Sequence, residues 1–100
     1  MKTFRTYELA VDLYNRAKSV KLPSFLRSQL LRAASSVALN LAEGNARKGQ
    51  ADRRKFFNIS LASLREVQSI MRLEPKACRD LIQVADKLGG NLYCLQRSLL

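Results

Sequence analysis

The residues best suited to bind a polyanion lie in a short cationic segment between positions 47 and 55. Asp52 is the only acid within it. The segment follows Asn40-Leu41-Ala42-Glu43-Gly44, which has the small and apolar residues of a packed helix end. Clustered Lys and Arg side chains neutralise phosphates. The pattern predicts a packed scaffold presenting an anion-binding surface made by Arg47, Lys48, Arg53, Arg54 and Lys55.

Further along the chain, Arg54, Arg65 and Arg72 have a spacing that repeats on a helix. At 100° per residue these three positions fall within about 20° of one another and form a stripe about 27 Å long. Such a stripe can follow a phosphate backbone without reading bases. The alternative is an ordinary solvated face of a helix bundle. We expect Phe56 and Phe57 to lie in the core rather than stack on bases.

Catalytic chemistry has few candidate residues here. The chain contains no His, and the run 44–49 lacks the Lys-Ser/Thr pair that ends a phosphate-binding loop. Catalysis by Glu43 is the alternative, but no second carboxylate is spaced to share a metal or a proton with it. We therefore expect no enzyme, no metal and no cofactor, with a nuclease as an outlying alternative. Asn40, Glu43 and Gly44 are instead expected to stabilise a helix corner or a contact between subunits.

Length and charge restrict the class of protein. A chain of 100 residues predicts one domain, residues 1–100, with a radius of gyration of roughly 13 Å. There are 18 Lys and Arg against 8 Asp and Glu, a formal charge of +10. Nucleic acid is the commonest partner for such a charge, and an anionic membrane surface or an acidic protein is the alternative.

The cellular compartment is predicted from apolar runs and cysteines. No apolar run approaches the roughly 20 residues that span a bilayer, and Glu8 and Asp12 interrupt the region where a signal peptide needs an apolar core. Cys78 and Cys94 are expected to be buried small hydrophobes rather than a disulfide. We expect a cytoplasmic protein that does not enter membranes.

Helical periodicity dominates the sequence, and no stretch alternates as a strand would. Breaks at Pro23, at 44–49 and at Glu74-Pro75 predict helices over 6–20, from Ser24 to about 43, over 52–73 and from Pro75 onward. Ser24 and Asp52 are the expected N-caps. The last helix is expected to continue through Gly89-Gly90, and a break there is the alternative. Its apolar seam reads Cys78, Leu81, Ala85, Leu88, Leu92, Leu95 and Leu99.

Four helices joined by short links predict an all-α, up-down-up-down antiparallel four-helix bundle. Several apolar residues fall outside the main stripes: Leu39, Ile59, Ala62 and Tyr93. Exposed apolar patches mark interfaces, so we expect a homo-oligomer. A single bundle with a ragged apolar surface is the alternative.

Two runs, Ala33 to Arg47 and Arg53 to Met71, resemble proteins of the ribosomal RNA intervening-sequence family. That grouping includes the accessory variability determinant of diversity-generating retroelements. The shared elements are Asn40-Leu41-Ala42-Glu43-Gly44, then a basic loop, Phe56-Phe57, and Ser63-Leu64-Arg65-Glu66. They cover roughly positions 24 to 73, whereas the first and last helices fit only by pattern.

The resemblance implies a homopentameric barrel of four-helix bundles without catalytic activity, and in the retroelement members it implies binding of nucleic acid and reverse transcriptase. The chain is short and carries the Gly89-Gly90 pair, but its basic third helix favours the retroelement type. The expected function is therefore a nucleic-acid-binding accessory protein of a reverse transcriptase, organising template RNA or cDNA. The alternative is an intervening-sequence scaffold protein that docks an acidic partner. The preference for RNA or DNA is left open.

Overall fold

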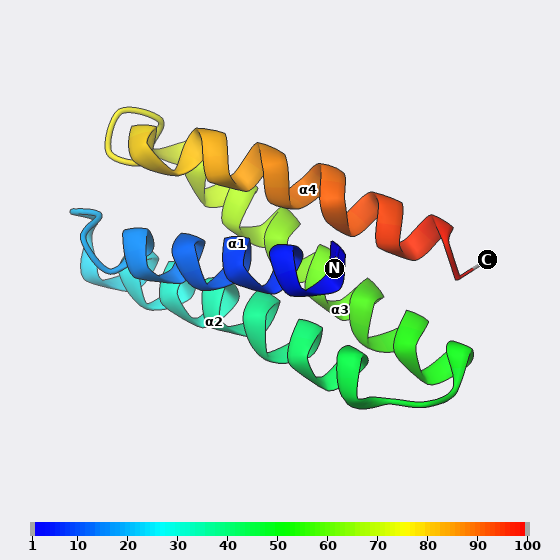
Figure 1. The fold of residues 1–100 in the computed structure, drawn as a ribbon. Helices are drawn as coiled ribbons and strands as arrows, with labels where there is room; N and C mark the ends of the chain where they lie inside the picture. The colour runs from blue at the N-terminus through cyan, green and yellow to red at the C-terminus, as the bar shows by residue number, and fades with distance from the viewer. Residues whose placement is uncertain (1, 100) are drawn as a thin grey trace.

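Four helices in antiparallel order form the molecule in the computed structural model, which describes residues 2–99 (Figure 1). They are α1 (Lys2–Ala17), α2 (Ser24–Ala46), α3 (Gln50–Leu73) and α4 (Ile82–Arg97). A short 3₁₀ helix, η1 (Arg79–Leu81), leads into α4. Each helix packs against its neighbours in a ring of α1, α2, α3 and α4, and no strand occurs among these residues. The predicted up-down-up-down bundle is confirmed.

The core is the apolar seam that the 3,4 spacing predicts. Every position of the expected α4 seam from Cys78 to Leu99 is buried, and so is the stripe of α2 that runs from Leu26 to Leu41. The radius of gyration of 13.1 Å agrees with the expected size. Two apolar side chains of α3, Val67 and Ile70, also lie in the core.

The helix boundaries differ from the prediction because backbone geometry sets them. Helix α1 begins at Lys2 and ends at Ala17, not 6–20. Ser24 is the first residue of α2 and makes no capping hydrogen bond, while Pro23 occupies the N-cap. Gly49 is the N-cap of α3, so Asp52 lies inside the first turn. Its negative charge there interacts favourably with the helix dipole.

The link from α3 to α4 also departs from the prediction. Helix α3 ends at Leu73, and the N–H of Glu74 donates to the carbonyl of Ile70 at 3.0 Å. Pro75 lies in the turn that follows, not in the first turn of the last helix. The N–H of Cys78 then donates to Glu74 at 3.1 Å, and η1 begins directly after it. Helix α4 continues without a break through Gly89-Gly90, as expected.

The tightest helix contact is between α2 and α3. Small residues line it, and the buried hydroxyl of Ser60 donates to the carbonyl of Val37 at 2.8 Å. These two helices are thereby held in a fixed register, which positions the cationic residues of both.

Candidate nucleic-acid interface

The cationic segment surrounds the corner between α2 and α3. Helix α2 ends at Ala46, and Arg47 adopts an extended conformation with its N–H donating to Gly44 at 3.3 Å. Lys48 is exposed in the short link before α3. The corner is therefore a tight turn that brings cations of the link and of the first turns of α3 to one end of the bundle.

The cations of this corner point in different directions. The guanidinium of Arg47 and the ammonium of Lys55 lie over the ring of Phe56, at 4.8 Å and 5.8 Å from its centroid. Phe56 is only half-buried, so the expectation that it belongs to the core is wrong. Phe57 is buried as expected. Successive helical residues rotate by 100°, so Arg53, Arg54 and Lys55 leave α3 in three different directions.

Arg53 lies on the side of this corner that faces the start of α1. Its guanidinium lies 5.8 Å from the centroid of Phe57. It also lines a hollow of about 430 Å³ with Phe4, Tyr7 and Asn45. Arg53 is therefore separated from Arg54, which faces α4.

Asn40 participates in a hydroxyl network between α2 and α3. Its Nδ2 donates to the carbonyl of Ser36 at 2.8 Å and to the Ser36 hydroxyl at 3.0 Å. The Ser36 hydroxyl in turn lies 2.8 Å from that of Ser63 on α3. Asn40 thus supports the α2/α3 contact from a half-buried position.

Glu43 forms an ion pair with Arg47 at 3.1 Å on the exposed end of α2. An exposed pair of this kind contributes little to stability, and it joins residues of one helix end rather than two helices. Gly44, by contrast, is buried against Phe57. Within the motif, Gly44 packs directly against α3 and Asn40 supports the same contact through Ser36, whereas the Glu43–Arg47 ion pair joins two residues at the end of α2.

Arg54, Arg65 and Arg72 lie on the flank of α3 that faces α4. Arg54 donates from Nη1 to the carbonyl of Leu99 at 2.9 Å. Arg65 and Arg72 line a hollow of about 580 Å³ whose opposite wall includes Ile82 and Asp86. Neither of these two makes a hydrogen bond or an ion pair within residues 2–99. We call these three residues the arginine stripe.

A second hollow, of about 290 Å³, lies at the Arg54 end of the stripe. Its lining adds residues that sequence reasoning did not assign to the site: Asn58, Tyr93, Gln96 and Arg97. The Arg97 guanidinium lies 5.8 Å from the Tyr93 centroid. The sequence indication was present, because Tyr93 falls outside the α4 seam and Arg97 follows it by one helical turn. We use the name α3/α4 groove for the surface that joins the two hollows.

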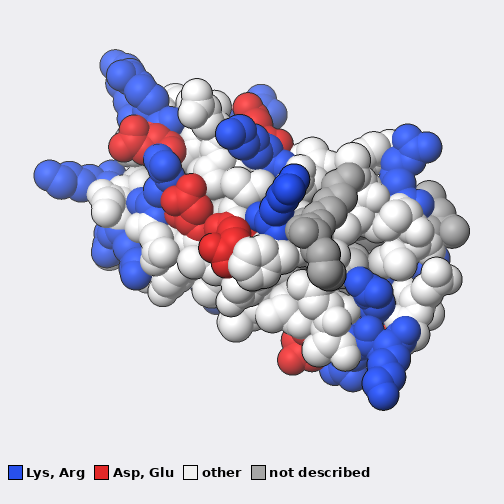
Figure 2. Space-filling view, in the orientation of Figure 1, with Lys and Arg blue, Asp and Glu red and all other residues white. Residues whose placement is uncertain are grey.

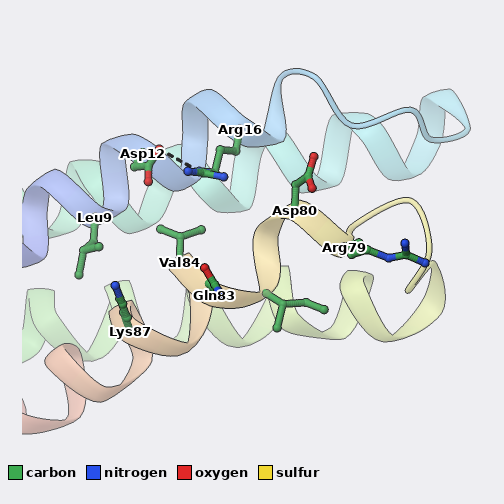
Figure 3. Close-up of a pocket in the computed structure, with 9 residues that line it drawn as sticks. Leu9, Asp12, Arg16, Arg79, Asp80, Gln83, Val84 and Lys87 are labelled. Atoms are coloured by element: carbon green, nitrogen blue, oxygen red, sulfur yellow. Dashed lines mark hydrogen bonds and ion pairs between the residues drawn. The ribbon is translucent and has the colours of Figure 1, made fainter.

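The neighbouring side of the bundle, between α1 and α4, has a different charge pattern. Figure 2 shows Lys and Arg projecting at both ends of the visible face, with several Asp and Glu side chains lying among the cations. A hollow of about 440 Å³ on this side includes Asp12 and Asp80 among cations (Figure 3). Arg16 is paired there with Asp12 at 3.0 Å. Arg16 is therefore already paired, whereas Arg65 and Arg72 of the α3/α4 groove have no intramolecular partner within residues 2–99.

The two cysteines have different surroundings. Cys78 is buried at the α3/α4 link, as predicted, and burial raises the pKa of its thiol, with a smaller contribution from the charge of Glu74. Cys94 is exposed, so the prediction that it is buried is wrong. It lies on the outward side of α4, away from the leucine seam.

Within the described part of the chain, no three His, Cys, Asp or Glu residues are grouped so as to hold a metal ion. None of the described helices is both long enough and apolar enough to cross a membrane.

The fold and the groove define an all-α bundle protein with a cationic surface along one helix pair. The model of the 23S rRNA-intervening sequence protein family matches residues 4–87. This chain therefore belongs to that family. No curated protein and no solved structure matches the sequence at a significant level.

Proposed function

We propose that this chain is a non-enzymatic protein that binds nucleic acid through phosphate contacts along the α3/α4 groove. The observation that carries the proposal is the pair Arg65 and Arg72, which share one hollow and have no intramolecular partner within residues 2–99. Unpaired guanidinium groups on one flank are available to phosphate oxygens. The formal charge of +10 supports the same conclusion.

Contacts between the arginine stripe and phosphates would position a nucleic acid on the protein without recognising its base sequence. A stripe of arginines on a helix flank contacts the backbone of a nucleic acid, and such contacts carry no base information directly. Positive charge is added at the N-terminal end of α3 by Arg47, Lys48 and Lys55. These cations extend the phosphate-binding surface around the corner without making it sequence-specific.

The family match supports the intervening sequence of ribosomal RNA genes as the genetic context. The reverse-transcriptase partner expected from the resemblance rests on the basic third helix alone. A reverse-transcriptase gene beside the coding sequence would support that partner, and a position inside a ribosomal RNA gene would contradict it.

We also propose that the protein assembles as a homo-oligomer, with the pentamer as the expected state. Leu39 is 65% exposed and Ile59 is 39% exposed, on the neighbouring helices α2 and α3. Burying such side chains against a second copy removes apolar surface from water. Light scattering on the chain and on Leu39→Glu tests this, because an 11.3 kDa mass for the unaltered chain would contradict assembly.

The test of nucleic-acid binding measures affinity for a labelled mixed-sequence RNA and DNA between about 50 and 200 mM salt. We expect affinity to fall steeply with salt. The double variant Arg65→Glu/Arg72→Glu should weaken binding and reduce the salt slope by about 1.4 to 1.8, since each phosphate contact contributes about 0.7 to 0.9. Arg5→Glu/Arg32→Glu is the matched control, because it changes the net charge equally at exposed positions outside the groove.

Equal losses in the two double variants would mean that total charge, not the groove, carries binding. Undiminished binding to Arg65→Glu/Arg72→Glu would contradict the proposal. Binding of an acidic polypeptide such as polyglutamate, without binding of RNA or DNA, would identify the alternative scaffold that docks an acidic protein.

A further inference from the structure

The two hollows of the α3/α4 groove lie in line along the same side of the helix pair. At 100° per residue, Arg54, Arg65 and Arg72 share one direction on α3, and Ile82 and Tyr93 share one direction on α4. Arg54 and Tyr93 line one hollow, and Arg72 and Ile82 line the other. A ligand that follows the arginine stripe therefore passes through both hollows.

Tyr93 provides an aromatic surface within this groove. The side chain is 55% exposed, although aromatic side chains usually pack into the core of a bundle. The Arg97 guanidinium lies close to the ring. Unpaired bases stack on aromatic rings of this kind, and a neighbouring Arg guanidinium adds to the binding.

Polar groups beside Tyr93 are also available. The side-chain amides of Asn58 and Gln96 line the same hollow and make no hydrogen bond within residues 2–99. An amide offers both donors and an acceptor, which suits the polar edge of a base. The hollow thus combines an exposed aromatic ring with hydrogen-bonding groups next to Arg54 of the arginine stripe.

The hollow at the other end has an apolar wall. Met71 and Ile82 lie beside Arg65 and Arg72, so a base or sugar could contact the apolar side chains while a phosphate contacts the arginines. The stripe is about 27 Å long. That length suits several nucleotides, within the range of about 4 to 16 found for one small binding domain.

We propose that the α3/α4 groove binds unpaired RNA or DNA in preference to a duplex, with phosphates on the arginine stripe and a base stacked on Tyr93. The inference rests on the proposed function and adds the strand state of the ligand. A duplex can reach the arginines through its backbone, but its bases are paired and stacked internally. Only an unpaired strand can offer a base to Tyr93.

The test compares the full-length chain with Tyr93→Leu and Tyr93→Phe. Each protein is titrated with a labelled single-stranded RNA, a single-stranded DNA and a duplex of the same sequence. Tyr93→Leu should weaken binding of the single strands by about tenfold, a typical loss for one stacked base. Binding of the duplex should be unchanged, and Tyr93→Phe should retain the single-strand affinity because it keeps the ring.

Phe25→Leu is the matched control, since Phe25 is an exposed aromatic on α2 outside the groove. It should leave all affinities unchanged. Circular dichroism melting of every variant checks that the bundle remains folded. A loss seen only with RNA or only with DNA supports the inference and identifies which of the two occupies the groove.

Failures of the two proposals give different results. If Tyr93→Leu has no effect, or weakens duplex and single strands equally, the stacking inference is overturned. The phosphate-binding function then still stands if Arg65→Glu/Arg72→Glu loses affinity more than its control. If the unaltered chain binds none of the three nucleic acids, both proposals are overturned.

Discussion

Gly44 and Phe57 are in such close contact that a side chain at position 44 has no space. A Cβ atom placed on Gly44 would lie 2.5 Å from Cε1 and 2.7 Å from Cδ1 of Phe57. The ring is buried in the core, so any shift of it displaces other core side chains. No residue between 2 and 99 has a positive φ, so this glycine is required by packing and not by an unusual backbone conformation.

We predict that Gly44→Ala destabilises the bundle by about 1–3 kcal/mol, the usual cost of overpacking a core. The added methyl group would displace Phe57 or separate α2 from α3. Urea denaturation measures the change in free energy of unfolding. Phe57→Leu in the Gly44→Ala background should cost less than it does alone, because the smaller side chain relieves the clash.

Gly90 provides the opposite case within the same molecule. A Cβ atom there would meet nothing within 4 Å, and at Gly89 it would meet Leu64 at 3.6 Å, an ordinary contact. Both residues lie inside α4. We predict that Gly90→Ala stabilises the protein by about 1 kcal/mol, the difference in helix propensity. Similar destabilisation by Gly44→Ala and Gly90→Ala would contradict the packing explanation.

The fold was predictable because spacing along a helix records which side is buried. The seam of α4 from Leu81 to Leu99 is the clearest example, and every predicted position in it is buried. Helix ends were less predictable. Gly49 and Pro23 act as N-caps through their backbone conformation and make no side-chain capping bond, so the choice of Asp52 and Ser24 from their side chains failed.

The candidate site was predictable only in part. Helical spacing aligned Arg54 with Arg65 and Arg72, but it could not show that Arg54 also bonds to Leu99, 45 residues away. Arg53 and Lys55 adjoin Arg54 in sequence and yet face other partners. Contacts between distant segments depend on how the helices pack, and spacing along one helix does not contain that information.

Arg54 has a structural role that the other two stripe residues lack. Its hydrogen bond to the carbonyl of Leu99 ties the residues that follow α4 to α3. We predict that Arg54→Gln lowers the free energy of unfolding by about 1 kcal/mol, a typical value for one hydrogen bond. Arg65→Gln and Arg72→Gln should change it by less than about 0.5 kcal/mol, as exposed substitutions usually do. Thermal or urea denaturation compares the three, and equal effects would show that the contact with Leu99 is not stabilising.

The hydroxyl of Ser60 is predicted to matter more than that of Ser63. Ser60 is buried and donates to Val37 across the α2/α3 contact. Ser60→Ala should destabilise by about 1 kcal/mol. Ser63 is half-buried, and its partner Ser36 also receives a hydrogen bond from Asn40, so Ser63→Ala should cost less. Urea denaturation in parallel tests the order, which would be wrong if Ser63→Ala were the more damaging change.

The two thiols should react at very different rates in the folded protein. Cys94 is exposed, whereas Cys78 is buried and the pKa of its thiol is raised, first by burial and then by the charge of Glu74. Because the thiolate is the reactive form, a thiol reagent near pH 8 should modify Cys94 rapidly and Cys78 slowly. Urea should remove the difference.

The same shift predicts how Cys78 affects stability with pH. A raised pKa in the folded state means that the folded chain holds the thiol proton more tightly than the unfolded chain does. Stability is therefore unaffected below the ordinary thiol pKa of about 8.5 and decreases as the pH rises beyond it. Cys78→Ala should lack this component, so the alkaline loss of stability should be smaller than in the unaltered chain. If native Cys78 and Cys94 react equally fast, and Cys78→Ala leaves the alkaline decrease unchanged, then Cys78 is not buried as the fold requires.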